Sequence, residues 1–282
     1  MSRRAEMEDA RRTGGALLRS ARRAPVHAAT LALASLGMLL AAAGGVRAQA
    51  TTPPPAPQIA AFSSASDASV PPPWRLVTLP KLPRHTHYRI EPLDGERVLR
   101  VTTDGSYANL VHPLTADVRA TPVLRWRWRV ARLPEGTDLR RKDGDDVAAR
   151  VCVLFDLPLE RLSAGERIKV RLGRTLFDPA LPAASICYVW DRAIAAGTWL
   201  PSAYTGRVQM LVLRSGASGH PLDTWQAETR DLAADFAQAF PEEAARGPLP
   251  PLLAVGVSGD GDNTGSRALA FFGDLSLSAA PK

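Results

Sequence analysis

Residues 124–130 constrain the fold more than any other stretch, because apolar and cationic side chains alternate along them without a break. They read Leu-Arg-Trp-Arg-Trp-Arg-Val. A pleated strand places successive side chains on opposite faces, so the leucine, the two tryptophans and the valine share one face. Arg125, Arg127 and Arg129 share the other face. A helix would scatter the same residues around its axis, so the pattern predicts a strand between a core and a polar layer.

Short apolar segments separated by turn signals make up most of the chain after residue 73. Asp94-Gly95 and Asp104-Gly105 are dipeptides that favour tight hairpin turns. The segment 148–156 is almost continuously apolar, which predicts a central strand buried on both faces. The other predicted strands are 74–79, 88–91, 97–103, 108–112, 123–130, 186–190, 208–214, 225–229, 252–257 and 268–277. With no alternation of strands and helices, the pattern predicts an all-β, antiparallel, jelly-roll-like β-sandwich.

One short helix is predicted late in the chain. Leu232, Phe236 and Phe240 recur every four residues within the segment 231–240, which would lay one apolar stripe on the sheet. Asp231 is placed to cap the first turn of this helix. Residues 157–183 contain three prolines and are predicted to form an irregular surface excursion.

The first 73 residues predict an exported protein. Residues 1–48 combine an arginine-rich start, an apolar run and a small-x-small ending at Val46-Arg47-Ala48, which is typical of an export signal. An uncleaved membrane anchor is the alternative, because the apolar run is nearly long enough to span a bilayer. Residues 49–73 are rich in Pro, Ala and Ser and predict a disordered linker. A single domain would then occupy residues 74–282 in the periplasm or outside the cell.

The distribution of charge argues against a nucleic-acid partner. The chain has a formal net charge of +7, but residues 1–48 hold 8 arginines and 3 acids, which leaves 27 basic and 25 acidic residues beyond them. The predicted mature domain is therefore nearly neutral. Any membrane contact would come through the export signal if it stays uncleaved.

The two cysteines, Cys152 and Cys187, each lie in an apolar segment and lack metal-binding spacing. They either form a disulfide, if their strands are neighbours in an oxidising compartment, or are two small buried side chains.

Two acidic motifs are candidate ligand contacts. Asp145 and Asp146 lie just before Arg150, and either bind a ligand or form a solvated turn that pairs with an arginine. Asp262 and Asn263 belong to the loop 260–265, whose spacing resembles the first half of a calcium loop. The twelfth position of that loop is a phenylalanine rather than glutamate, so an EF-hand is excluded. No cofactor is predicted, and a looser calcium site at this loop is the alternative to a self-capped turn.

Further candidates lie on the strands. Tyr188 and Trp190 fall on one strand face and serve either as core or as a platform for sugar rings, with Trp190 the better candidate for a surface position. Arg230 and Asp231 precede the predicted helix, and a functional role would pair Asp231 or Asp235 with Arg127 across the sheet. The cationic face of residues 125–129 needs counter-ions. Candidate counter-ions are Asp145, Asp146, Asp231 and Asp262.

Six short motifs in order resemble an exported bacterial family of domains of unknown function. They are Leu-Arg-Trp-Arg-Trp-Arg-Val at 124–130, Asp-Asp-x-Ala-Ala-Arg-Val at 145–151, Tyr-x-Trp at 188–190, Trp-x-x-Glu-x-Arg-Asp at 225–231, Asp-Asn-Thr at 262–264 and Phe-Gly-Asp-Leu at 272–275. The resemblance covers roughly residues 74–277 and implies a periplasmic β-sandwich without a known activity. Cys187 departs from the family pattern, which implies that a disulfide there would be particular to this protein. The last strand also resembles that of jelly-roll carbohydrate-binding modules.

The sequence contains no nucleophile elbow, zincin motif, phosphate loop or dinucleotide fingerprint. Our leading hypothesis is an exported domain that binds a glycan or another component of the cell envelope. One alternative is a hydrolase of envelope polysaccharide that uses two carboxylates among Asp145, Asp146, Asp231 and Asp262. The other is a structural or assembly protein without a small ligand.

Overall fold

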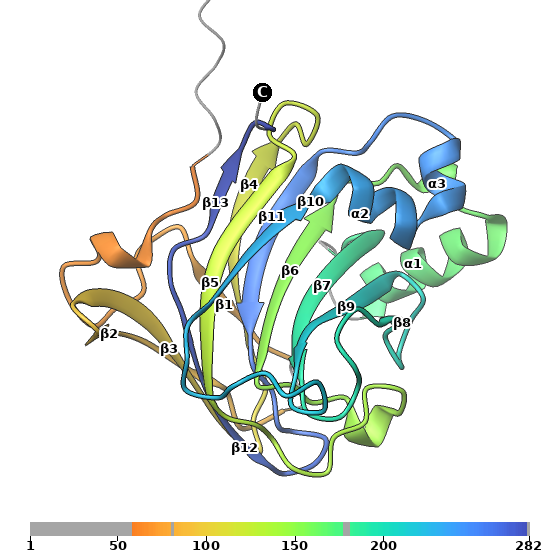
Figure 1. The fold of residues 1–282 in the computed structure, drawn as a ribbon. Helices are drawn as coiled ribbons and strands as arrows, with labels where there is room; N and C mark the ends of the chain where they lie inside the picture. The colour runs from red at the N-terminus through yellow and green to blue at the C-terminus, as the bar shows by residue number, and fades with distance from the viewer. Residues whose placement is uncertain (1–57, 80–81, 177–180, 281–282) are drawn as a thin grey trace, which may run out of the picture. The chain divides into compact units, whose positions relative to one another are not determined.

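The computed structural model describes residues 58–79, 82–176 and 181–280, and within them two β-sheets pack face to face (Figure 1). The seven-stranded sheet has the order β1-β4-β11-β6-β7-β9-β8. The six-stranded sheet has the order β10-β5-β12-β3-β2, with β13 also paired to β5. The strands are β1 (Arg75–Val77), β2 (His87–Leu93), β3 (Glu96–Asp104), β4 (Asn109–Ala116), β5 (Val123–Arg132), β6 (Ala149–Phe155), β7 (Ala184–Asp191), β8 (Trp199–Pro201), β9 (Val208–Ser215), β10 (Gln226–Asp231), β11 (Leu252–Ser258), β12 (Arg267–Phe272) and β13 (Ser276–Ser278).

The predicted fold class, a mostly antiparallel β-sandwich, is confirmed. Residues 123–132 form β5, and its apolar face, including Trp126 and Trp128, is buried in the core. The strand β6 lies in the middle of its sheet, as its continuous apolar character predicts. Asp94 and Gly95 form the tight turn between β2 and β3 and both have positive φ values, 53° and 84°. One strand pair, β7 with β9, is parallel.

The prediction of a single late helix is incomplete. The predicted helix is α2 (Leu232–Ala239), and Asp231 caps it by accepting hydrogen bonds from the amides of residues 233 and 234. Within the described residues there are also α1 (Ala164–Leu176), α3 (Pro241–Ala245) and three short 3-10 helices, η1 (Phe62–Ser64), η2 (Lys142–Gly144) and η3 (Leu159–Arg161). The excursion predicted at 157–183 therefore contains α1. None of the helices in the described part of the chain is long and apolar enough to cross a membrane.

The folded region begins before residue 74. Ile59 and Phe62, which lie in the predicted linker, are buried, and the Phe62 ring stacks on Trp74 with centroids 4.9 Å apart. Composition misled the prediction here, because these two large apolar residues are enough to fix a proline- and serine-rich segment against the core. The predicted export signal, residues 1–48, lies outside the described residues.

Cys152 and Cys187 are joined in a disulfide between β6 and β7. The two residues lie directly opposite each other in the antiparallel register of these strands. Both side chains point to the outer face of the seven-stranded sheet, where Cys187 packs with Val189, Met210 and Val212 in a small second core. The bond therefore links two adjacent central strands outside the main core.

Breaking this disulfide should destabilise the domain. It closes a loop with a sequence separation of 35 residues, so reduction or the Cys152→Ala/Cys187→Ala double variant should lower the free energy of unfolding by about 2–4 kcal/mol. Urea unfolding with and without dithiothreitol measures this difference. Identical midpoints under the two conditions would contradict the bond.

Candidate functional site

The candidate site lies at the end of the seven-stranded sheet where β6 begins and β11 ends. Along β6, Ala149 and Val151 face the core, so Arg150 between them faces the outer side of the sheet. In the antiparallel register of β6 and β11, Arg150 lies opposite Ser258, the last residue of β11. The loop that leads into β6 and the loop that leaves β11 are therefore neighbours. They bring together Asp145 and Asp146 from the first loop with residues 260–264 from the second.

Asp146 holds the two loops together. It is fully buried, and one carboxylate oxygen accepts hydrogen bonds from the backbone amide and the side-chain amide of Asn263, at 3.2 and 3.1 Å. The other oxygen accepts from the backbone amide and the hydroxyl of Thr264, at 2.7 and 2.6 Å. Its acceptor sites are occupied within the protein, so the role of Asp146 is structural.

Asp260 and Arg150 form a buried ion pair beneath these loops. The Asp260 carboxylate accepts a hydrogen bond from the amide of Val147 at 2.7 Å and lies 3.2 Å from Nη1 of Arg150. Burial raises the pKa of Asp260 to about 7, against the lowering effect of the Arg150 charge. Burial alone would lower the pKa of Arg150, but the charges of Asp260 and Asp145 outweigh it and raise that pKa, so the guanidinium stays charged.

Several buried polar atoms beside this pair have no hydrogen-bond partner among the described residues. They are Nε and Nη2 of Arg150, Oδ1 of Asp145 and Oδ1 of Asp262. Oδ1 of Asp145 lies 3.7 Å from Nη2 of Arg150, which is beyond hydrogen-bond distance, and the Asp145 side chain is only 9% exposed. Unpaired buried donors and acceptors cost free energy unless a water or a ligand satisfies them.

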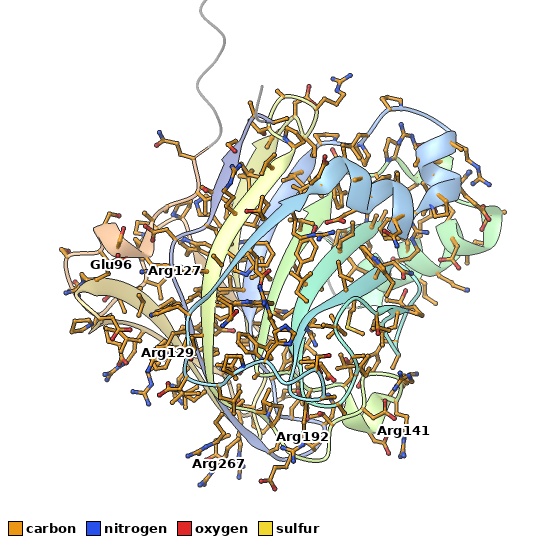
Figure 2. All side chains as sticks on the ribbon, viewed as in Figure 1. Glu96, Arg127, Arg129, Arg141, Arg192 and Arg267 are labelled. Carbon is orange, nitrogen blue, oxygen red and sulfur yellow. A yellow bond between two sulfur atoms is a disulfide. The ribbon has the colours of Figure 1, made fainter. Side chains whose placement is uncertain are left out.

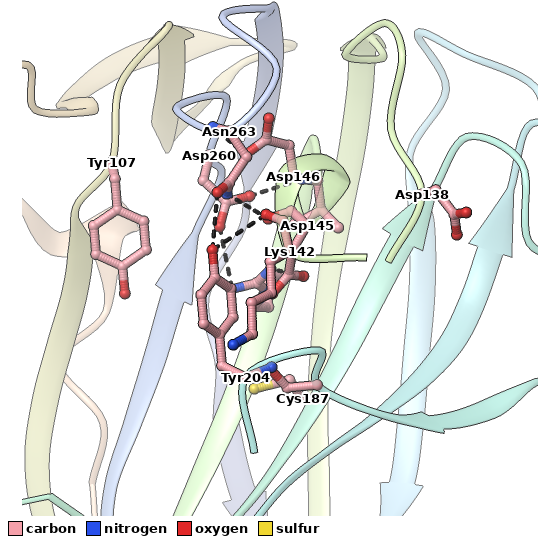
Figure 3. A network of polar contacts seen from close by, with 12 residues as sticks. Tyr107, Asp138, Lys142, Asp145, Asp146, Cys187, Tyr204, Asp260 and Asn263 are labelled. Carbon is pink, nitrogen blue, oxygen red and sulfur yellow. Dashed lines mark hydrogen bonds and ion pairs between the residues drawn. The ribbon is translucent and has the colours of Figure 1, made fainter. Parts of the chain in front are cut away.

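Tyr204 borders the network from the turn between β8 and β9. Its hydroxyl lies 2.9 Å from Oδ1 of Asn263 and 3.2 Å from the carbonyl oxygen of Lys142, and can donate to either (Figure 3). The Lys142 ammonium lies 5.4 Å from the centroid of the ring. Tyr204 as a whole remains 56% exposed. Sequence reasoning missed Tyr204, since it stands in an irregular turn with no pattern that marks a ligand contact.

The charge of the site is negative. Asp145, Asp146, Asp260 and Asp262 surround Arg150, and burial raises the pKa of both Asp145 and Asp262. The repulsion between neighbouring carboxylates adds to this effect. A site with free carboxylate oxygens, a guanidinium edge and excess negative charge suits hydroxyl or ammonium groups better than phosphates.

The predicted site residues therefore divide into two sets. Asp145, Asp146, Arg150, Asp262 and Asn263 come together in the network described above. The others, Arg127, Tyr188, Trp190, Arg230 and Asp231, belong to β5, β7 and β10 and lie elsewhere.

Tyr188 and Trp190 belong to the core. Both are fully buried, so the prediction that Trp190 forms a surface platform is wrong. Trp190 packs on Trp128 of the opposite sheet, which its place at the end of an apolar segment did not reveal. The Tyr188 hydroxyl donates to Asp235 at 2.6 Å, and Arg230 pairs with the same carboxylate. These are structural contacts between β7, β10 and α2.

Arg127 and Arg129 on β5 pair with acids other than the predicted ones. Arg127 pairs with Glu96 (Figure 2). Arg129 pairs with Asp94 and Asp223. Arg127 also lies over the ring of Trp225, 4.6 Å from its centroid. The strand β5 belongs to the six-stranded sheet, whereas the acids of residues 145, 146 and 262 lie at the end of the other sheet, which the sequence could not show.

Three side chains of the loop 260–265 are engaged in contacts within the protein. The Asp260 carboxylate binds Val147 and Arg150, and Asn263 and Thr264 bind Asp146. Within residues 58–280, apart from the undescribed gaps, no group of three or more His, Cys, Asp or Glu side chains is arranged to hold a metal ion.

Two shallow hollows lie on the surface beside the β8–β9 turn, and both include Glu166 of α1. One, of about 420 Å³, is lined by Tyr204 with Glu166 and Lys169 of α1. The other, of about 410 Å³, is lined by Arg207, Glu243 and their neighbours. Arg150 lines neither of these two hollows, whereas Tyr204 lines the first of them.

The fold and the site together define a two-sheet β-sandwich domain with a buried acidic network at the end of one sheet. Residues 72–276 match the family described as a protein of unknown function, DUF3047, and the chain belongs to this family. No curated protein matches the chain.

The raised pKa of Asp260 predicts that stability falls as the pH rises. The unfolded chain releases this proton near pH 3.8, whereas the folded protein retains it to about pH 7. The folded state binds more protons in this window, so the free energy of unfolding should decrease between pH 4 and 7, by at most about 4 kcal/mol from this group. Asp145 and Asp262, whose pKa values are also raised, act in the same direction.

Urea unfolding across this pH range measures the effect. The Asp260→Asn variant keeps an acceptor for the Val147 amide but removes the titrating group, so its stability should depend less on pH. An unchanged pH dependence in this variant would contradict the assignment.

Proposed function

We propose that this protein is an exported ligand-binding domain of the cell envelope, periplasmic or secreted, that binds a glycan through the network around Arg150 and Tyr204. The observation that carries the proposal is the set of unpaired buried atoms on Arg150, Asp145 and Asp262 beside an exposed aromatic ring. In the structural networks at Asp146 and Asp235, by contrast, carboxylate oxygens are occupied by protein donors.

The chemistry of the site supports a polyhydroxylated ligand. A sugar hydroxyl can donate to a carboxylate and accept from a guanidinium at the same time. Oδ1 of Asp145 and Nη2 of Arg150, which are 3.7 Å apart, are suited to such a hydroxyl. The exposed face of Tyr204 offers an apolar surface for a sugar ring. The excess of carboxylates favours neutral or amino sugars over acidic ones.

Two observations support export. The arginine-rich, apolar start of the sequence with its small-x-small ending is typical of an export signal. The Cys152–Cys187 disulfide is a kind of bond that persists in oxidising compartments and is rare in the cytosol.

Thermal melting of the full chain against neutral oligosaccharides, amino-sugar oligosaccharides and peptidoglycan fragments tests the proposal. A ligand at 100 times its dissociation constant should add about 2.7 kcal/mol of stability. Tyr204→Ala should lower the affinity for that ligand by about tenfold, because the substitution removes the aromatic surface on which the sugar ring would pack. Leu222→Ala, at an exposed leucine outside the site, is the control and should bind as the wild type does.

If no member of the panel shifts the melting temperature, or if Tyr204→Ala binds as tightly as the wild type, the glycan proposal fails. The structural or assembly role would then be the better hypothesis.

A hydrolase is the second candidate, and one observation favours it. Asp145 and Asp262 combine raised pKa values with free carboxylate oxygens, a combination common among catalytic acids. Asp146 and Asp231 are poor candidates, because the first binds Asn263 and Thr264 and the second caps α2. Release of reducing ends that disappears in Asp145→Asn while binding persists would support the hydrolase.

A further inference from the structure

The helix α1 is oriented with its more apolar face outward. Val170 is its buried contact with the core, and it lies on the face opposite Ile168 and Leu172. Ile168 is 66% exposed and Leu172 is 55% exposed. These two side chains are one turn apart and form a single outward stripe. In a helix that only covers a core, the apolar stripe would face the protein.

Contacts of neighbouring side chains fix this orientation. Arg167 donates to the carbonyl oxygen of Leu159 at 3.1 Å, and Arg174 donates to that of Leu181 at 2.9 Å. At Gly173 an added Cβ would lie 2.9 Å from the side chain of Leu181, so this residue packs closely on the helix. The outward position of the apolar stripe is therefore imposed by the anchored inner face.

Basic side chains flank the stripe on both sides. At 100° per residue, Lys169 lies on one side of Ile168 and Arg171 on the other, and both are exposed. Across its residues 164–176, α1 has four basic side chains and a single acid, Glu166. Glu166 pairs with Lys169, whereas Arg171 forms no ion pair with any described residue. The helix stands at the periphery of the domain, beyond β9 and next to α3 (Figure 1).

We propose that α1 docks this domain on an anionic membrane surface. Ile168 and Leu172 would enter the boundary between head groups and acyl chains while Lys169 and Arg171 contact anionic head groups, the arrangement by which amphipathic helices lie in the plane of a bilayer. The 13 residues of α1 are too few to span a membrane, so the helix lies on it.

Charge complementarity favours lipid over a second copy of the chain. A two-fold interface places a patch against itself, so the cationic flanks formed by Lys169 and Arg171 would lie close to those of the partner. The two exposed apolar side chains also provide far less area than the roughly 1,200–2,000 Å² that a stable interface buries.

Co-flotation of the full chain with vesicles tests the proposal. The wild type should bind vesicles of phosphatidylcholine with phosphatidylglycerol, and bind vesicles of phosphatidylcholine alone much more weakly. The Ile168→Ser/Leu172→Ser variant should lose at least about tenfold in binding. The Lys169→Gln/Arg171→Gln variant should lose roughly thirtyfold. Leu222→Ser, which changes an exposed leucine elsewhere, is the matched control and should bind normally.

A fluorophore attached to α1 distinguishes membrane contact through this helix from contact through the apolar run within residues 1–48. Both native cysteines are in the disulfide, so Ile168→Cys provides a unique thiol for an environment-sensitive dye. Its emission should move to the blue with anionic vesicles, whereas a dye at Leu222→Cys should not respond.

An unchanged emission of the dye at position 168 would overturn the proposal. Vesicle binding by the Ile168→Ser/Leu172→Ser variant that equals that of the wild type would also overturn it. A lipid-free dimer that becomes monomeric in the serine variant would instead make this face an interface between copies.

Discussion

The packing of aromatic side chains between the two sheets is the contact on which the rest of the structure depends. Trp126 of β5 lies 5.2 Å from Tyr188 of β7, and Trp128 lies 5.8 Å from Trp190, as measured between ring centroids. Large rings that interlock in this way fix the spacing and angle of the sheets. Because strand side chains alternate, this contact also decides which residues of each strand face outward. The arginines of β5 are thereby turned to one outer surface, and Arg150 of β6 to the opposite one.

Charged groups inside the sandwich show how such a core accommodates polar atoms. Glu228 accepts from the indole of Trp128 and pairs with Arg214, while Asp235 accepts from Tyr188 and pairs with Arg230. Both networks use the carboxylate to satisfy an aromatic donor and a guanidinium together, which offsets the cost of burial. The network around Arg150 differs, because buried atoms of three of its residues lack partners. That difference separates the network around Arg150 from the networks at Glu228 and Asp235.

The candidate site and α1 are neighbours in the structure. One surface hollow is lined both by Tyr204 and by Glu166 and Lys169 of the helix. A domain that rests on a membrane through α1 would hold Tyr204 close to the lipid surface, so the two proposals place ligand binding at the membrane face of the envelope. They rest on different atoms, however, and either can fail alone.

The sequence by itself determined the strands, the sandwich and the helix after Asp231, because alternation, turn dipeptides and helical spacing are local properties of residues 88–103, 124–130 and 231–240. It also brought Asp145, Asp146, Arg150, Asp262 and Asn263 forward as candidates. It could not separate buried Trp190 from exposed Tyr204, nor pair Arg127 with Glu96, since these depend on which strands become neighbours. It missed α1 because the three prolines within residues 157–183 indicated an irregular segment, although Ile168 and Leu172 stand at helical spacing. Only the tertiary structure decided these points, because burial and ion pairing arise between segments far apart in the chain.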